Sequence, residues 1–141
     1  KLKYVLKIVG TGKEEAYLRS IAHDNVEFLG AVSDSELDQL YAGAKGFIAL
    51  AKEEDFGMTV VEAMAAGTPV IAFNGGGFKE TVVDGETGVF VEGTDVKTLE
   101  AAMKRFNSIK WSKEKLISRA RLFSKEKFVE NVRKEIAKVN A

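Results

Sequence analysis

The sequence predicts an α/β fold in which a parallel sheet is covered by helices. Short apolar runs alternate with longer amphipathic segments along the whole chain, and this alternation is typical of parallel sheets built from strand-helix units. The chain has 141 residues, of which 45% are hydrophobic. That is enough for a single core and too little for two ordinary ones, so we expect one domain over residues 1–141.

Each apolar run predicts a strand, and each amphipathic segment predicts a helix. The expected strands are 4–9, 26–30, 46–50, 69–73 and 88–91, which we expect to form one small sheet. The expected helices are about 13–23, 34–44, 57–66, 78–83, 95–107 and 112–138, the last broken near Ser124. Ser33, Ser35 and Thr94 precede helical segments, where a side-chain oxygen can accept from unpaired first-turn amides.

Two apolar features of the C-terminal third are interpreted as packing surfaces. A stripe at helical spacing is formed by Phe128, Val132, Ile136 and Val139, and such a stripe usually faces a core. Trp111 lies between two expected helices, where an aromatic ring is more often buried than used as an anchor for a partner.

The composition excludes several classes of function. Lys plus Arg and Asp plus Glu each number 21, so no net charge attracts nucleic acid or an anionic membrane. There is no cysteine, which excludes disulfides, thiolate catalysis and cysteine-based zinc sites and is compatible with a reducing cytoplasm. The N-terminus is too short and interrupted for a secretory signal. The chain begins at Lys1 rather than at Met, immediately ahead of the first expected strand, and we expect it to be a fragment of a longer protein.

Two nucleotide-binding patterns fail at the first strand-to-helix turn. Gly10 and Gly12 suit a dinucleotide fingerprint, but Glu15 occupies the third glycine position. A phosphate-binding P-loop fails as well, because Glu14 stands where Ser or Thr should ligate magnesium. A turn that needs φ > 0 explains both glycines. His23 is the only histidine, and no second metal ligand or catalytic set can be assembled around it.

The stretch AKEEDFGMTVVEAMAAGTP carries the informative signal. It predicts an acidic loop followed by a helix whose first amides, around Gly57, Met58 and Thr59, have no intrahelical partner and suit phosphate. Glu62 lies one turn further, between Val61 and Ala63. A charged carboxylate there must reach water, a donor or a ligand hydroxyl. Ribose hydroxyls would suit it, and a solvated helix stripe is the alternative.

The loop NGGGFKE follows the fourth expected strand. Its three glycines allow a backbone to approach a ligand closely, although an ordinary flexible turn is the alternative. In open parallel sheets ligands bind at the carboxyl ends of the strands. The acidic loop and the glycine loop therefore predict a pocket for a neutral polyol attached to phosphates.

The segment EEDFGMTVVEAMAAGTPVIAFNGGGFKETVVDGETGVFV resembles the C-terminal, nucleotide-sugar-binding domain of family 4 retaining glycosyltransferases of GT-B fold. The family pattern has two glutamates separated by seven residues, here Glu54 and Glu62. The likeness covers about residues 2–107. One departure is Val60, where many members carry proline; a helix tolerates the exchange. The resemblance implies a Rossmann-like donor-binding domain over 1–141, with the N-terminal acceptor domain absent.

The resemblance also implies roles for individual residues. Glu62 would hold the ribose hydroxyls, and Glu54 would lie beside the transferred sugar and stabilise positive charge as the anomeric bond breaks. Asp55 before Phe-Gly is similar to members that use GDP-mannose, so the activity that the resemblance implies is that of a mannosyltransferase. The remaining implied donor-binding residues are Phe56, Gly57, Met58 and Thr59 at the sugar or diphosphate, Ala31 and Val32 at the nucleobase, and Gly10 and Gly12 nearby.

The implied partners are a nucleotide-sugar donor, GDP-mannose or a UDP-sugar, and a glycan or lipid-linked acceptor held by the missing domain. Neither a metal nor a cofactor is expected, and the implied location is cytoplasmic, at the membrane only through the parent protein. In family members an Arg and a Lys on a segment just before the first strand neutralise the diphosphate. Because that segment and the acceptor domain are absent from this chain, we expect the chain alone to be inactive. The alternatives are a non-catalytic or regulatory nucleotide-sugar-binding domain and a flavodoxin-like interaction module.

Overall fold

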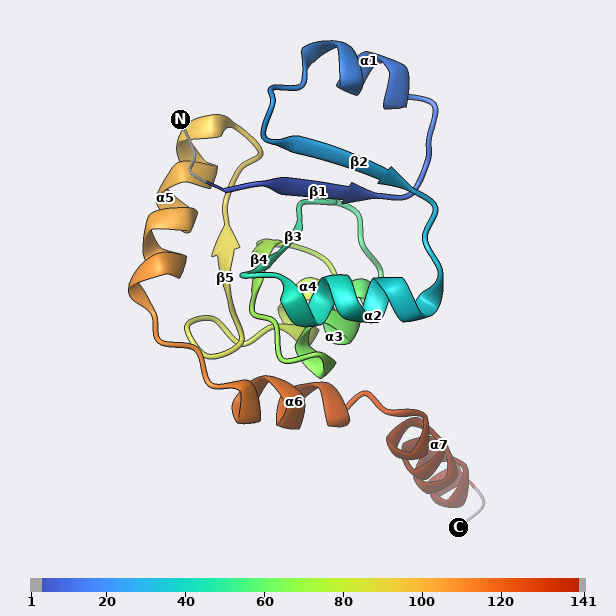
Figure 1. Cartoon of the computed structure of the whole chain (residues 1–141). Helices are drawn as coiled ribbons and strands as arrows, with labels where there is room; N and C mark the ends of the chain where they lie inside the picture. Colours follow the sequence, from blue (N-terminus) through green and yellow to red (C-terminus); the bar gives the residue numbers. More distant parts are fainter. Residues whose placement is uncertain (1–3, 140–141) are drawn as a thin grey trace. The chain divides into compact units, whose positions relative to one another are not determined.

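The computed structural model describes residues 4–139, with helices and strands in the predicted order (Figure 1). The strands are β1 (Leu6–Val9), β2 (Val26–Gly30), β3 (Phe47–Ala49), β4 (Val70–Phe73) and β5 (Gly88–Val91). The helices are α1 (Glu15–Ile21), α2 (Asp34–Gly43), α3 (Met58–Ala65), α4 (Phe78–Thr81), α5 (Val96–Ser108), α6 (Lys113–Arg121) and α7 (Lys125–Val139). The α/β class is confirmed, and the break near Ser124 separates α6 from α7.

The described strands pair as two parallel sheets, which corrects the expectation of a single one. β1 pairs with β2, and the second sheet has the order β3-β4-β5. Apolar patterning identifies strands but does not say which strands pair, because pairing is decided between segments far apart in sequence. The chain also divides into two compact units, Lys1–Gln39 and Leu40–Ala141, which are described separately below.

The first unit contains β1, α1, β2 and the start of α2. The strands are in parallel register, with Leu6 beside Val26 and Ile8 beside Phe28. The guanidinium of Arg19 on α1 lies 4.6 Å from the centroid of the Phe28 ring. No side chain described in residues 4–39 is fully buried, so this unit is held by backbone pairing and half-buried contacts.

Helix α2 begins with the serine cap that the sequence predicts. The Glu36 amide lies 3.3 Å from Ser33 Oγ, and the Ser33 amide donates to Glu36 Oε2 at 2.8 Å. This reciprocal pair is a capping box, and Ser35 lies inside the helix instead. The hydroxyl of Ser33 and its amide both donate to Glu36 Oε2, and these two hydrogen bonds lower the pKa of the Glu36 carboxyl.

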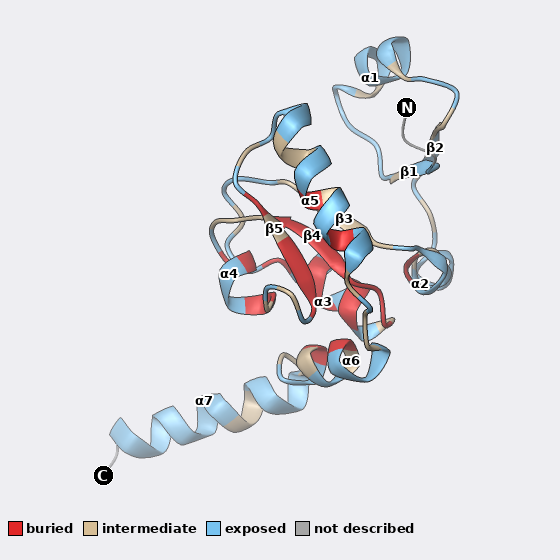
Figure 2. Cartoon of the chain, turned by 90° about the vertical axis from the view of Figure 1, so that its left-hand side faces the viewer, coloured by how far each residue is buried: buried red, intermediate tan, exposed pale blue. Residues whose placement is uncertain are grey.

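The second unit contains the buried core, which is concentrated on β4, β5 and α3 (Figure 2). One face of the sheet presents Ile71, Val89 and Val91, which pack against Ala102 and Phe106 of α5. Trp111 packs at the edge of this cluster, its ring centroid 5.0 Å from that of Phe106. The interpretation of Trp111 as a packing residue is therefore confirmed.

The opposite face of the same sheet is also covered. Successive strand residues point to opposite faces, and Val70 and Ala72 are both fully buried. Helix α3 contacts β3 and β4 and packs extensively against α6. Met64 of α3 and Leu116 of α6 are fully buried, so α6 forms part of the layer that supports α3.

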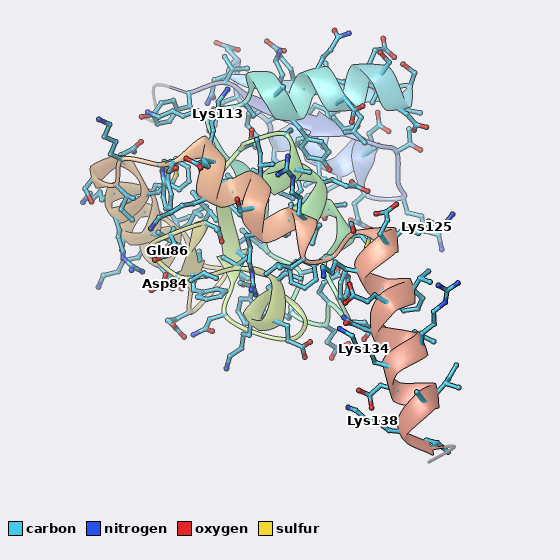
Figure 3. All side chains as sticks on the ribbon, turned by 90° about the horizontal axis from the view of Figure 1, so that it is seen from below. Asp84, Glu86, Lys113, Lys125, Lys134 and Lys138 are labelled. Carbon is cyan, nitrogen blue, oxygen red and sulfur yellow. The ribbon has the colours of Figure 1, made fainter. Side chains whose placement is uncertain are left out.

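Helix α7 continues beyond this core. Among its described residues none is buried, and Phe128, Ile136 and Val139 are more than half exposed. Lys125, Lys134 and Lys138 also project from it (Figure 3). The apolar stripe of α7 therefore packs on no core within the described residues, where α3, α5 and α6 cover the sheet of the second unit.

Candidate functional site

The acidic loop after β3 ends at a glycine that no other residue could replace without strain. Gly57 precedes α3 with φ 81°, a conformation that L-residues with a side chain rarely adopt. A Cβ placed on Gly57 would lie 2.7 Å from Cδ1 of Phe78. Both the backbone conformation and the buried Phe78 ring therefore fix the identity of this residue and the direction in which α3 begins.

Glu54 lies at this helix start and caps it. Its Oε1 accepts from the Gly57 amide at 2.9 Å, so this amide, which was expected to lack an intrahelical partner, is paired with a side chain outside the helix. A carboxylate placed three residues earlier can reach back to it, much as helix-capping side chains do. The amides of Met58 and Thr59 follow in the first turn, where no intrahelical carbonyl is available, and both residues are exposed.

The glycine loop after β4 packs against the acidic loop. The Gly77 amide donates to the Glu54 carbonyl at 2.7 Å. A Cβ on Gly76 would lie 2.3 Å from the Glu54 carbonyl oxygen, and one on Gly77 would lie 2.4 Å from the Asp55 carbonyl oxygen. The close backbone approach that the sequence predicts is made, but its partner here is the neighbouring loop.

Glu62 is exposed on α3, while Val61 and Ala63 beside it are buried. Its Oε2 accepts from the hydroxyl of Tyr41 at 3.2 Å. Tyr41 is only 6% exposed, and its ring packs edge-on against Phe47 with centroids 5.4 Å apart. The carboxylate thus has two of the three environments considered from the sequence, water and a donor group.

Sequence reasoning did not single out Tyr41. The segment ELDQLYAG shows a helix whose buried face includes a tyrosine, and a buried tyrosine usually directs its hydroxyl to a partner. That signal predicts a hydrogen bond, but not that Glu62, 21 residues later, is the acceptor.

Phe56 and Asp55 complete the acidic loop. Asp55 is exposed, and Phe56 is 38% exposed. The Phe56 ring is 5.6 Å from that of Phe123, in an edge-to-face arrangement. The second unit therefore brings together the predicted residues from Glu54 to Thr59 and Glu62 on one loop and one helix.

The other predicted residues lie in the first unit, at the carboxyl ends of its two strands. Gly10 has φ 101°, and its amide donates to the Gly30 carbonyl at 2.7 Å. Ala31 and Val32 follow Gly30 directly. The prediction of φ > 0 is confirmed for Gly10, whereas Gly12 does not adopt a positive φ.

The clearest electrostatic anchor in the second unit lies outside these loops. Asp84 forms a two-pronged ion pair with Arg105, at 2.7 Å and 2.8 Å. The Arg105 guanidinium lowers the pKa of the Asp84 carboxyl. This pair ties the segment before β5 to α5, and we assign it to the scaffold.

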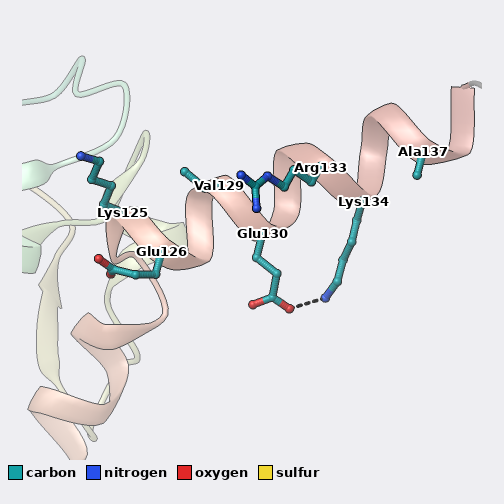
Figure 4. Close-up of a pocket in the computed structure, with 7 residues that line it drawn as sticks. All are labelled: Lys125, Glu126, Val129, Glu130, Arg133, Lys134 and Ala137. Carbon is teal, nitrogen blue, oxygen red and sulfur yellow. Dashed lines mark hydrogen bonds and ion pairs between the residues drawn. The ribbon is translucent and has the colours of Figure 1, made fainter.

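A groove of about 660 Å³ lies along α7 (Figure 4). It is lined by Lys125, Glu126, Val129, Glu130, Arg133, Lys134 and Ala137. All of these residues belong to one helix. The Glu130 carboxylate forms ion pairs with the ammonium groups of Lys127 and Lys134 at 2.7 Å and 2.6 Å, and these pairs lower the pKa of Glu130 to about 2. A groove with a single wall and none of the loop residues is not the candidate site.

Comparison with known proteins gives a family for this arrangement. A family model described as glycosyl transferases group 1 matches residues 1–123. The GDP-mannose-dependent monoacylated alpha-(1-6)-phosphatidylinositol monomannoside mannosyltransferase of Corynebacterium glutamicum is 40% identical over 104 residues, 67% of this chain and 27% of that protein.

Solved structures show the same fold. Sucrose-phosphate synthase from Thermosynechococcus elongatus has a TM-score of 0.77 at 26% identity, covering 95% of this chain and 38% of that one. An Anabaena protein in complex with UDP-glucose has a TM-score of 0.62 at 26% identity, covering 96% of this chain and 40% of that one. The chain thus spans less than half of each of these three proteins.

Proposed function

The chain belongs to the glycosyl transferases group 1 family, and we propose that it is the nucleotide-sugar-binding part of a family 4 retaining glycosyltransferase. Its structural neighbours are GT-B glycosyltransferases. The proposed donor is GDP-mannose, which the name of the Corynebacterium relative supports, and the Asp55-Phe56-Gly57 sequence agrees with this choice. A UDP-sugar is the alternative donor, supported by the UDP-glucose complex of the Anabaena neighbour.

One observation carries the proposal: two loops that each follow a strand meet backbone to backbone in front of the start of α3. The Gly77 amide bonds the Glu54 carbonyl, while the Glu54 side chain caps Gly57. Ligands of parallel sheets bind at this edge, and a helix start whose first amides have no intrahelical partner favours phosphate. The diphosphate would meet the amides of Met58 and Thr59.

Glu62 would hold the ribose, and its position on α3 suits that role. It lies four residues after Met58, about 6 Å along the helix axis. A carboxylate accepts from hydroxyls, and the two vicinal hydroxyls of a ribose would replace water at its exposed side. Tyr41 would hold the carboxylate in place from the buried side, through its hydrogen bond to Oε2.

Glu54 would act at the sugar. Oε1 accepts from Gly57, and a carboxylate has a second oxygen that would accept from a sugar hydroxyl. In the proposed transfer the bond from the anomeric carbon to the phosphate oxygen breaks, and the acceptor oxygen bonds to the same face. The acceptor proton passes to the leaving phosphate. A fixed negative charge near the sugar stabilises the positive charge that develops there.

A non-catalytic nucleotide-sugar-binding domain is the second candidate, favoured by the capping of Gly57 by Glu54. A carboxylate that caps a helix has a structural role that needs no chemistry. Glu54→Gln in the whole protein separates the two candidates, since glutamine keeps an oxygen for the cap and loses the charge. Loss of transfer with nucleotide binding retained supports the enzyme, and unchanged transfer supports the sensor.

The acceptor and the location of the whole protein are also proposals. We propose a glycan or lipid-linked acceptor, bound outside the present chain, at the cytoplasmic face of a membrane. Among the described residues no helix is long and apolar enough to cross a bilayer. The proposal assigns no step to a metal or a cofactor.

Calorimetric titration of this chain with GDP, UDP and ADP tests the donor site. We expect one nucleotide to bind most tightly and Glu62→Ala to weaken it by about 1–3 kcal/mol. Glu100→Ala, an exposed glutamate of α5, is the matched control and should bind as the wild type does. A Glu62→Ala variant with unchanged affinity for every nucleotide would remove Glu62 from the site.

A further inference from the structure

We propose that Arg119 and Phe123, at the carboxyl end of α6, are positioning residues that hold the acidic loop and α4 in the geometry of the candidate site. The inference rests on the proposed function for the identity of the ligand. It concerns two side chains that lie far along the chain from either loop and outside every motif identified in the sequence.

Arg119 holds the end of α4. Its Nε donates to the Thr81 carbonyl at 2.9 Å, and its Nη2 donates to the Glu80 carbonyl. The last carbonyls of a helix have no intrahelical donor, and α4 has a single turn. A planar guanidinium presents two donors side by side, so one residue satisfies both carbonyls and ties α4 to α6.

The position of α4 also determines the positions of the glycine loop and the acidic loop. α4 starts immediately after Gly77, whose amide bonds the Glu54 carbonyl. Its first residue, Phe78, is 1% exposed and lies where any side chain on Gly57 would have to go. A displacement of α4 would therefore be transmitted to Glu54 and to the start of α3.

Phe123 contacts the acidic loop through Phe56. Its ring lies 5.6 Å from that of Phe56 with the planes 79° apart, an edge-to-face geometry that stabilises aromatic pairs. The Arg119 guanidinium lies 5.0 Å from the Phe123 centroid, within the range of a cation–π contact. The two residues thus support one another as well as the loop.

The support itself is rigid. Leu116 is fully buried and Ala120 is 6% exposed, and α6 packs extensively against α3. α3, α6, α4 and the acidic loop consequently form a closed circuit of contacts around the helix start. Because both residues contact protein groups in this circuit, we assign them no direct contact with the nucleotide.

Two variants of this chain test the proposal, Phe123→Ala and Arg119→Lys. We measure amide hydrogen exchange and amide chemical shifts of Gly57 and Gly77 by NMR, with the affinity for GDP alongside. We expect faster exchange and shifted resonances at both amides, and affinity roughly 2- to 10-fold weaker, the size of an aromatic pair. Phe123→Tyr keeps the ring and should restore wild-type values.

The matched controls are the variants Leu122→Ala and Arg121→Lys, at residues that neighbour Phe123 and Arg119 along the chain. Leu122 is 53% exposed and Arg121 is exposed on the same helix, so neither change should alter Gly57 or Gly77. The amide of Val89, in the centre of the sheet, reports global unfolding. Equal loss of protection at Val89 and at the two glycines would make the effect one of overall stability and would overturn the proposal.

Unchanged shifts and exchange at both glycines in both variants would overturn it as well. A different result would contradict the proposed function. A wild-type chain that binds none of GDP, UDP and ADP removes the nucleotide site, while the exchange and shift measurements still decide whether Arg119 and Phe123 position the loops.

Discussion

The two units of the chain differ in how their turns are held. In the second unit Gly57 and Gly77 are closed in by the Phe78 ring and by backbone atoms of Asp55, above strands that are almost fully buried. In the first unit a Cβ on Gly10 or Gly12 would meet nothing within 4 Å. Glycine-rich turns in the two units are therefore held differently. Gly57 and Gly77 are fixed by packing against neighbouring atoms, whereas Gly10 and Gly12 are not.

The strands show the same contrast. β4 has three buried residues and one half-buried residue, whereas β1 has one half-buried residue and three exposed ones. A two-stranded sheet is marginally stable at best, while three strands packed against helices can sustain a core. The comparison indicates that the free energy of unfolding comes mainly from the second unit.

The largest effect is expected from a leucine in each unit. Leu116→Ala removes a fully buried side chain of α6 and should lower the free energy of unfolding by about 2–5 kcal/mol. Leu18→Ala, at a residue that is 39% exposed, should cost less than about 1 kcal/mol. Urea denaturation of both variants measures the difference, and equal losses would contradict the comparison.

Next in size is a pair of glycines. Gly77→Ala forces a Cβ against backbone atoms of Asp55 and Phe56, so we expect it to destabilise the chain by about 1–3 kcal/mol. Gly12→Ala meets no atom within 4 Å and has no positive φ. It should be neutral or stabilising by up to about 1 kcal/mol. Thermal denaturation compares the two, and a stable Gly77→Ala variant would show that the loops do not pack as described.

Substitution of a tyrosine in each unit should have a smaller effect, on nucleotide affinity. Tyr41→Phe keeps the ring beside Phe47 and removes the hydroxyl that donates to Glu62. We expect nucleotide affinity to fall by about 0.5–1.5 kcal/mol. Tyr17→Phe, at a residue 60% exposed in the first unit, is the control. Calorimetry distinguishes them, and equal affinities would deny Tyr41 a role in holding the carboxylate.

The smallest effect concerns pH. Arg105 lowers the pKa of Asp84 below its ordinary value, so the pair stabilises the fold above about pH 4 and loses this contribution as pH falls through the lowered pKa. The pair is partly exposed, which limits the contribution to less than about 1 kcal/mol. Asp84→Asn should flatten the acid limb of a stability-against-pH curve slightly, and a steeper acid limb would reverse the assigned sign.

The sequence predicted the position of every strand and helix because each has a clear apolar period bounded by polar or glycine-rich turns. It also predicted the cap at Ser33. Asp95, rather than the predicted Thr94, caps α5, its Oδ1 accepting from the Thr98 amide at 3.0 Å. Adjacent residues with capping side chains compete, and backbone geometry decides between them.

Contacts between segments distant in the chain could not be predicted in this way. Three hydrogen bonds join segments that are 21 residues or more apart: from Tyr41 to Glu62, from Arg119 to α4, and from Gly77 to Glu54. The same limit explains the sheet: the pattern identifies β3 and β1 equally well, but says nothing about which strands they pair with. Composition and spacing suggested the site residues, whereas tertiary packing determines what each contacts.

An NMR titration of this chain with GDP, UDP and ADP, following every amide, is the direct test of a donor site at the acidic loop and the glycine loop. We expect one nucleotide to shift the amides of Met58 and Thr59 and those of the glycine loop at residues 74–77, with Glu62 among the affected residues. Shifts confined to α7, or no shift with any of the three nucleotides at millimolar concentration, would contradict a donor site at these two loops.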